Sequence, residues 1–329
     1  MTAQITIIGL GKIGASIGLA LGKHTDLLTR TGNDIDNSVA RQAHKLGAVD
    51  KIQVNLPAAV EKADIILLAL PADQIRATLE VIAQDVKENA VVMDTSPCKG
   101  KVNEWVRELL PDHRHYIGLA PVLNPAYLDQ PAGGIEAARA DLFEKGLVAI
   151  TGDGEAIKLA ADFIALLGAV PLFTDLAELD GFLAAVHTLP KLAAAALTNA
   201  LIQAPGWADR RKLAGNMFAA STALAADGGA ALYEEALANR ENILHVLDNL
   251  IAELAVFRYE LDEKNVALKS HFESAVHSRE QWLKERRSGN WLTAEMRTPE
   301  MPRFRDHLKQ MVGDPAKLFG LRRKTTKDK

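Results

Sequence analysis

A histidine and a lysine one helical turn apart offer the first chemistry in this sequence. His187 and Lys191 fall in an alanine-rich, helix-patterned stretch at residues 183–201, and positions i and i+4 share one helix face. Histidine titrates near neutral pH and suits proton transfer, and a lysine can hold a carboxylate or act as an acid. Asn199 lies two turns further along that face, where its amide could hydrogen-bond a substrate. Structural roles are the alternative: a hydrogen-bonded histidine inside an apolar helix, and a lysine whose ammonium reaches the helix edge.

A glycine-rich turn near the start of the chain offers an anion site. A β-branched run at residues 5–8 leads into the turn, after which the apolar spacing becomes helical. The turn consists of Gly9, Leu10, Gly11, Lys12, Ile13 and Gly14. The first glycine permits a tight bend, the second lets the backbone approach a pyrophosphate, and the third lets helix and strand pack closely. Because backbone N–H groups at a helix N-terminus favour an anion, the turn predicts a dinucleotide site.

An acidic residue supports the dinucleotide prediction. Asp34 ends the next apolar segment, twenty positions after Gly14 (34 minus 14), where a carboxylate would bind ribose hydroxyls. We assign the capping of a helix at residues 37–46 to Asp36 and ribose binding to Asp34, the alternative being that either acid only caps that helix. NAD is the expected cofactor because Asp34 would repel a 2′-phosphate and the nearest downstream arginine is Arg41; NADP stays possible.

Further candidates follow the ends of predicted strands. Apolar runs at residues 63–71, 90–94 and 116–125 have the pattern of parallel strands, and ligands bind beyond the carboxyl ends of such strands. We therefore predict that Leu70, Pro71 and Thr95 contact the cofactor. Ser96 is a catalytic candidate and Asn124 a substrate-binding candidate, with turn and loop roles as the alternative for both.

Composition limits the class of protein. At 329 residues the chain exceeds one typical domain, and its 48% hydrophobic and 24% charged residues are ordinary for a soluble globular protein. The net charge of -4 gives no electrostatic reason to expect nucleic acid. Apolar runs are interrupted before the ~18–20 residues that span a bilayer, so we expect no transmembrane helix. Cys98 is the one cysteine and the first strand begins almost at Met1, so the cytoplasm is the expected compartment.

The elements divide the chain into three parts. Residues 1–174 alternate strands with helices, which predicts an α/β Rossmann domain with a doubly wound, mostly parallel sheet; residues 146–151 and 169–174 would be edge strands around a helix at 155–167. Residues 175–287 predict an all-α helical domain for substrate binding and dimerisation, with helices at 183–201, 208–226 and 232–261. Residues 288–329 form a basic extension whose tip, 322–329, we expect to be a frayed terminus.

The sequence resembles the prephenate and arogenate dehydrogenase family of tyrosine biosynthesis. The similarity is carried by GLGKIGAS at residues 9–16, ADIILLALP at 63–71, Asp94 with Lys99-Gly100, DGFLAAVHTLP at 180–190, AGNMF at 214–218 and ANRENIL at 238–244. The resemblance implies a Rossmann domain joined to a helical dimerisation domain, NAD(P)-dependent oxidation, and an active site between the two.

Three positions depart from the family pattern. Ala120 stands where the family places a catalytic histidine, Pro97 where it places a serine, and Ala223 where it places an arginine. By the resemblance, that serine and histidine act on the ring hydroxyl of prephenate and that arginine binds a carboxylate. Either other residues fill these roles or the substrate is not prephenate. Our candidates for catalysis are His187, Lys191 and Ser96, and for substrate binding Asn124, Asn199 and Arg240.

We predict a homodimeric NAD-dependent oxidoreductase of the prephenate or arogenate dehydrogenase type. It would transfer hydride between a small carboxylate-bearing substrate and nicotinamide. The alternatives are a related enzyme that acts on a different hydroxy acid or imine, and an NAD-binding homologue without turnover. No metal is predicted, since the histidines lack ligand spacing, and neither nucleic acid nor membrane is an expected partner.

Overall fold

One sheet dominates the computed structural model, which describes residues 2–128, 133–152, 154–226, 228–289, 304 and 306–308. The sheet has eight strands in the order β3-β2-β1-β4-β5-β6-β7-β8. Neighbouring strands are parallel except for β6 and β7. The strands are β1 (Ala3–Ile8), β2 (Leu28–Asn33), β3 (Lys51–Ile52), β4 (Ile65–Leu68), β5 (Val91–Asp94), β6 (His115–Val122), β7 (Leu147–Gly152) and β8 (Val170–Phe173). The strand order reverses between β1 and β4, which confirms the predicted doubly wound, mostly parallel sheet.

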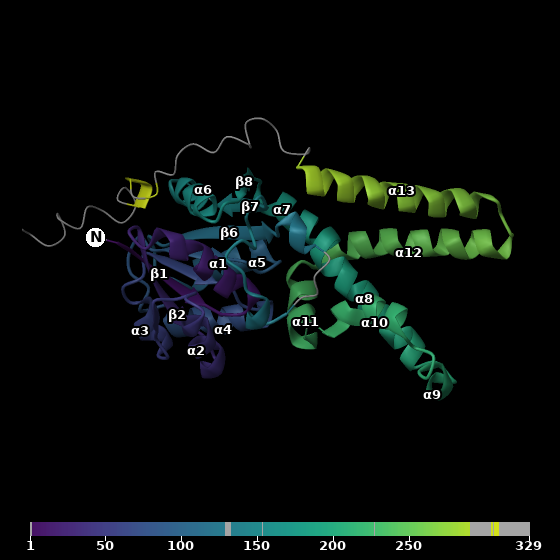
Figure 1. Ribbon diagram of the computed structural model, residues 1–329, viewed down its shortest axis with the longest axis horizontal. Coiled ribbons are helices and arrows are strands. Elements are labelled where there is room, and N and C mark those ends of the chain that lie inside the picture. The colour runs from purple at the N-terminus through teal and green to yellow at the C-terminus, as the bar shows by residue number, and fades with distance from the viewer. Residues whose placement is uncertain are drawn as a thin grey trace, which may run out of the picture.

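Helices cover both faces of this sheet (Figure 1). They are α1 (Lys12–Leu21), η1 (Gly22–His24), α2 (Asn37–Lys45), α3 (Leu56–Val60), α4 (Ala72–Ile82), α5 (Lys99–Leu109), η2 (Pro125–Tyr127), η3 (Ile135–Ala137) and α6 (Ala156–Leu166). Side chains alternate along β4: Ile65 and Leu67 enter the core under α1 and α6, whereas Ile66 and Leu68 enter the core under α4 and α5. Burial on both faces explains the continuous apolar run at this strand.

The prediction that residues 146–151 form an edge strand is wrong. β7 lies between β6 and β8 and runs antiparallel to β6, so only β8 is an edge on that side. An antiparallel return needs no crossover helix, and the pattern of apolar residues does not reveal which neighbour a strand will pair with.

A helical region follows the sheet. It contains α7 (Leu176–Leu183), η4 (Ala184–Thr188), α8 (Leu189–Ile202), α9 (Trp207–Arg210), α10 (Asn216–Thr222), η5 (Ala223–Ala226), α11 (Gly229–Ala238), α12 (Arg240–Asp262) and α13 (Ala267–Ser288). The helix predicted at 208–226 is divided into α9, α10 and η5, and the one predicted at 232–261 is divided at Asn239, whose backbone is not helical. α12 and α13 extend away from the sheet as a pair (Figure 1).

α7, η4 and α8 form one continuous helix, Leu176–Ile202, which is long and apolar enough by length and composition to cross a membrane. The expectation that no stretch would reach this length is therefore wrong. Within this chain only 17% of its apolar window is buried. Its charged residues are bound to other parts of the protein, because Asp180 contacts α5 and Lys191 pairs with Glu235 of α11.

Part of the C-terminal extension packs on the sheet domain. Phe304 is buried in the core that includes Phe163 of α6. His307 Nδ1 lies 2.7 Å from the Oδ2 atom of Asp162, also on α6. The basic tip at residues 322–329, predicted to be frayed, lies outside the described residues.

Candidate functional site

The glycine turn has the geometry of a dinucleotide cradle. Gly9 has a φ of +89°, and a Cβ atom there would lie 2.4 Å from the carbonyl oxygen of Ala69. A Cβ atom on Gly14 would lie 2.0 Å from the carbonyl oxygen of Gly9. A Cβ atom on Gly11, by contrast, would meet no described atom within 4 Å. Gly9 and Gly14 therefore allow close packing within the fold, and Gly11 leaves open the space where the backbone would approach a pyrophosphate.

Asp34 follows β2 directly and binds the glycine turn. Its Oδ2 atom accepts a 2.7 Å hydrogen bond from the Leu10 N–H, and its Oδ1 atom accepts one of 2.9 Å from the Asp36 N–H. Asp36 caps α2 by accepting a hydrogen bond from the Ser38 N–H, as predicted. Asp34 is therefore held beside the cradle, at the strand end where the predicted ribose contact would occur.

Two cations lie near the same turn. Burial, followed by the positive charge of Arg139, lowers the pKa of Lys12 below its usual value. Mutual repulsion of this kind shows that the two side chains share a locality, and a phosphate placed there would relieve it. The residues present therefore fit a dinucleotide.

The predicted cofactor rim forms at the ends of β4 and β5. Leu70 lies against the turn, since its Cδ2 atom would be 3.0 Å from a Cβ atom on Gly9. Pro71 is the exposed N-cap of α4, and the Thr95 hydroxyl donates to the Leu68 carbonyl over 3.3 Å. These three residues lie together beside the glycine turn, as expected for a shared strand edge.

Ser96 is buried behind this rim. Its N–H donates to Asp94 Oδ1 over 2.7 Å, and its hydroxyl lies 3.6 Å from the Cys98 Sγ atom. Burial, followed by the charge of Asp94, raises the pKa of the Cys98 thiol to about 12. In this conformation the Ser96 hydroxyl therefore contacts a neutral thiol within the turn.

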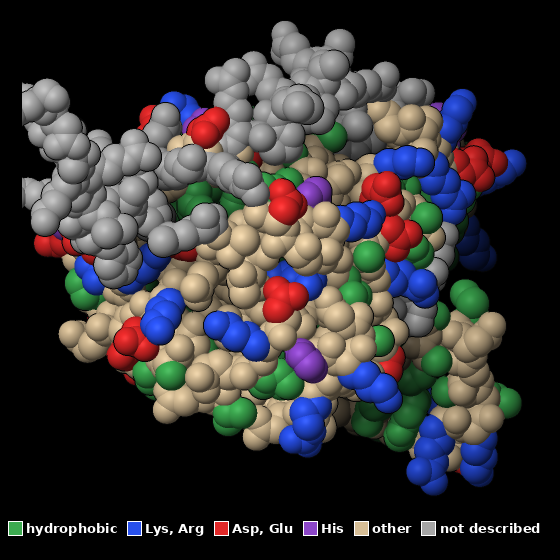
Figure 2. Space-filling model, turned by 60° about the vertical axis from the view of Figure 1, so that its left-hand side comes forward, with side chains coloured by type: hydrophobic (Ala, Val, Ile, Leu, Met, Phe, Trp, Pro, Cys, Tyr) green, Lys and Arg blue, Asp and Glu red, His purple; other side chains and the backbone are tan. Residues whose placement is uncertain are grey.

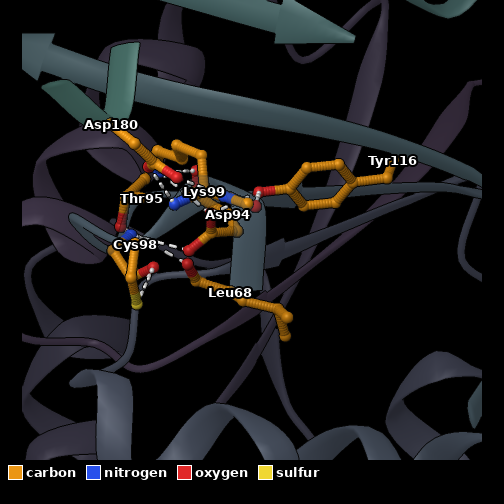
Figure 3. A network of polar contacts seen from close by, with 9 residues as sticks. Leu68, Asp94, Thr95, Cys98, Lys99, Tyr116 and Asp180 are labelled. Carbon is orange, nitrogen blue, oxygen red and sulfur yellow. Dashed lines mark hydrogen bonds and ion pairs between the residues drawn. The ribbon is translucent and has the colours of Figure 1, made fainter. Parts of the chain in front are cut away.

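A buried polar network joins the sheet to the helical region (Figure 3). Lys99 and Asp94 are fully buried, and the Lys99 ammonium donates to the Asp94 carboxylate and carbonyl, each over 2.9 Å. The Tyr116 hydroxyl donates to the same carboxylate over 2.9 Å. Asp180 of α7 accepts hydrogen bonds from the backbone of α5. The network buries a lysine and two carboxyl groups at the junction of the two regions.

His187 lies in η4, a π-helical turn within the continuous helix. Such turns are often found at functional sites. Its side chain is 43% exposed yet crowded by neighbouring atoms, and this crowding, followed by the positive charges of Lys191 and Lys99, lowers the pKa of His187 to about 4. The imidazole is therefore neutral at pH 7 and able to accept a proton.

Lys191 is paired with a residue that the sequence analysis missed. Its ammonium lies 3.2 Å and 3.3 Å from the two carboxylate oxygens of Glu235, whose Oε2 atom is also 4.0 Å from His187 Nε2. Glu235 is buried on α11, four residues after the buried Ala231 and four before the buried Asn239. An acid in the middle of a buried helix face was the available signal, because it requires a cationic partner.

The remaining candidates lie apart from His187. The Asn124 side chain is used locally, since it accepts from the Ala126 N–H over 3.0 Å and donates to the Asp141 carbonyl over 3.1 Å. Asn199 is exposed about 12 Å along α8 from Lys191, and Arg240 is exposed at the start of α12. The structure does not bring these three into the cluster around His187.

The structure places two of the positions that depart from the family pattern, Ala120 and Ala223. Ala120 is buried in a small apolar cluster with Ala149 and Leu179, which joins β6 and β7 to α7. Ala223 follows α10 as its C-cap. Ala120 therefore contributes packing between the sheet and the helical region.

Comparison with known proteins identifies relatives over most of the chain. Residues 17–172 match the family model described as prephenate dehydrogenase, nucleotide-binding domain. The chain is 25% identical to the prephenate dehydrogenase of Bacillus subtilis (strain 168) over 287 residues, which is 85% of this chain and 76% of that protein. It is also 25% identical to the cyclohexadienyl dehydrogenase of Zymomonas mobilis over 288 residues, 84% of this chain and 94% of that protein.

Solved structures agree at the level of the fold. A crystal structure of prephenate dehydrogenase from A. aeolicus, in complex with hydroxyphenyl propionate and NAD+, has a TM-score of 0.73 at 22% identity and covers 85% of this chain and 98% of that one. Synechocystis arogenate dehydrogenase has a TM-score of 0.64 at 22% identity, over 85% of this chain and 99% of that one. The glycine cradle and the strand order agree with a nucleotide-binding domain of the prephenate dehydrogenase type, and most of the chain is similar to prephenate and cyclohexadienyl dehydrogenases.

Proposed function

We propose that this protein oxidises prephenate or arogenate with NAD as the preferred cofactor. Residues 1–174 would bind the dinucleotide, and residues 175–287 would complete the substrate site and form a homodimer. The relatives that are named for these substrates support the substrate class. Asp34, held beside the glycine cradle, supports NAD over NADP because its carboxylate would repel a 2′-phosphate.

The observation that carries the proposal is a neutral imidazole at the junction of the two regions. Bound NAD would supply the hydride acceptor. Oxidation of a ring alcohol to a carbonyl also releases the hydroxyl proton, which needs an acceptor close to the reacting carbon. His187 is that acceptor in our proposal, because burial, followed by the charges of Lys191 and Lys99, lowers its pKa and leaves the ring neutral at pH 7. In prephenate or arogenate the accompanying loss of CO2 makes the ring aromatic.

Lys191 would assist His187. Its ammonium is fixed by Glu235 on the same side of the helix as His187, where it keeps the imidazole neutral and attracts an anionic substrate. Ser96 stays a proposed third catalytic group. Asn124, Asn199 and Arg240 stay proposed substrate contacts, and the last two are exposed on the helical region, where a second copy of the chain could face them.

A homodimer would cover the apolar surface of the helical region. Large apolar side chains are exposed along its helices, among them Met217, Tyr233, Leu237, Ile251, Leu254 and Tyr259. Exposed apolar side chains in this number are typical of an interface. The face of the sheet domain in Figure 2 differs, since cations and anions are interspersed on it. The buried single cysteine, Cys98, supports a cytoplasmic location.

The test is a turnover assay of the purified protein with prephenate or arogenate, each with NAD and with NADP, followed at the nicotinamide absorbance. We expect turnover with NAD, and a fall in kcat of about 10²- to 10⁴-fold in His187→Gln. His245→Gln, an exposed histidine on α12, is the matched control and should leave kcat unchanged. Absence of turnover with either substrate would refute the proposed function, and a fully active His187→Gln would refute the role of His187.

A further inference from the structure

The N-terminus of α5 is capped by a residue from a distant helix. Asp180 of α7 accepts a 2.7 Å hydrogen bond from the Lys99 N–H with Oδ1 and a 2.8 Å hydrogen bond from the Gly100 N–H with Oδ2 (Figure 3). Cys98, at the N-cap position of α5, makes no side-chain capping hydrogen bond among the described residues. A carboxylate suits this place because it satisfies two backbone donors and opposes the positive end of the helix dipole.

The backbone of Asp180 is held as well. The Asn239 side chain, at the break between α11 and α12, donates to the Asp180 carbonyl over 2.7 Å. Asn242 in turn donates to the Asn239 side-chain oxygen over 2.8 Å. Asp180 therefore joins α5 of the sheet domain to α7, α11 and α12 of the helical region. Its side chain is buried, so these contacts are made away from water.

Gly100 shows how closely the two regions fit. A Cβ atom at this position would lie 2.7 Å from Asp180 Oδ2, well inside van der Waals contact. The absence of a side chain at Gly100 therefore allows the carboxylate to reach the backbone. This gives a second position from which the same contact can be disturbed without altering Asp180.

We propose that Asp180 is a positioning residue that fixes His187 relative to the cofactor rim. The two residues lie on one continuous helix, seven positions apart (187 minus 180), so the distance along the axis is roughly 10 Å. The α5 N-terminus bound by Asp180 directly follows the Thr95 and Ser96 turn at the end of β5. A helix anchored there carries His187 to a fixed place beside that strand end. This inference rests on the role of His187 proposed above.

The first test measures kinetics in Asp180→Asn and Gly100→Ala. An amide can accept only through its oxygen and would turn its NH2 group towards a backbone donor, whereas the new Cβ atom would displace the carboxylate. We expect kcat to fall at least about tenfold in both, with the KM for NAD changed less than twofold, because the glycine cradle lies elsewhere. Asp175→Ala is the matched control, since Asp175 is the N-cap of the same α7 and its carboxylate accepts a hydrogen bond from the Glu178 N–H of its own helix.

The second test needs no turnover: NMR titration of the His187 imidazole, assigned with His187→Gln. The groups that act on this ring are Lys191 on α8, Lys99 on α5 and Glu235 on α11. If the helix shifts away from Lys99, the pKa of His187 should rise from about 4 towards 6.5 in Asp180→Asn and Gly100→Ala, and not in Asp175→Ala.

The outcomes separate the two proposals. A wild-type protein without turnover, combined with the expected rise in the His187 pKa, would refute the function and keep the positioning role. Asp180→Asn that matches Asp175→Ala in kcat and in the His187 pKa but has a lower unfolding midpoint would show a purely structural contact and refute the positioning role. Should Asp180→Asn fail to fold, Gly100→Ala gives the same test with the carboxylate retained.

Discussion

His187 combines partial exposure with a lowered pKa, so its ring is both reachable and neutral at pH 7. A substrate can reach a side chain that is 43% exposed, while crowding and two lysines favour the neutral ring. A histidine with an ordinary pKa near 6.5 would be substantially protonated in mildly acidic conditions. His187 would stay competent there. We therefore expect that protonation of His187 does not reduce turnover in mildly acidic conditions.

The lowered pKa of His187 predicts how the free energy of unfolding changes with pH. The folded pKa of about 4 lies below the unfolded value near 6.5, so between these values the unfolded chain binds more protons. The contribution of His187 to the free energy of unfolding is thus fully present above pH 6.5 and is lost as the pH falls towards 4. Urea unfolding at pH 5 and pH 7 should show a smaller pH difference in His187→Gln than in wild type or in His245→Gln.

An equal pH difference in all three proteins would contradict the depressed pKa. The acid limb of kcat/KM gives an independent check at the same residue. It should reflect a group with a pKa near 4 rather than 6.5, because the free enzyme must hold His187 neutral to accept a proton.

At the scale of elements, α8 and α11 are joined by a buried ion pair. Lys191 and Glu235 are both nearly buried, and neither ion would be stable there without a partner of opposite charge. The pair therefore specifies how the two helices meet, and through His187 it connects that contact to the proposed chemistry. Sequence spacing placed Lys191 on the face of His187, but only the fold brought Glu235 against both.

Removal of one member of the pair should be costly. We expect Lys191→Met to lower the free energy of unfolding by about 3–5 kcal/mol, because it leaves a buried carboxylate without its lysine. Lys191→Met combined with Glu235→Leu should recover most of that loss, since the double change buries no charge. Denaturant unfolding of the wild type, the single variant and the double variant measures both effects. Equal destabilisation by the single and double variants would show that packing, not charge, dominates this contact.

For the whole molecule, the helical region exposes apolar side chains over several helices. The side chains of residues 251–256 on α12 are all exposed, including Ile251 and Leu254. The continuous helix Leu176–Ile202 is likewise only 17% buried across its apolar window. A second copy of the chain would cover such surfaces, whereas a monomer would expose them to water.

Charged substitutions on α12 test this assembly. We expect the wild type to sediment as a dimer and Ile251→Glu with Leu254→Glu to shift it to monomer, because two carboxylates would be buried in the interface. Glu253→Gln on the same helix is the control and should leave the dimer intact. Analytical ultracentrifugation of the three proteins decides the question. A monomeric wild type at micromolar concentration would contradict the proposed dimer.

The sequence by itself determined the features that depend on local pattern. The positions of Gly9, Gly11 and Gly14 must lack a side chain, as in any strand-turn-helix unit that binds a dinucleotide. Strands that alternate with helices in this way fold into a doubly wound sheet. The cap at Asp36 also follows from neighbours in the chain. The cofactor class and the first domain were therefore predictable, since short-range geometry and strand periodicity decide them.

Contacts between distant residues were decided only by the tertiary structure. The pairing of β7 with β6 depends on which edge is available, and the pairing of Lys191 with Glu235 joins positions 44 residues apart. Asp180 caps α5 across 80 or 81 residues of chain, a relation that no local spacing records. The cofactor cradle is a property of one turn, whereas the proposed base depends on the packing of two regions, and packing follows from the whole fold.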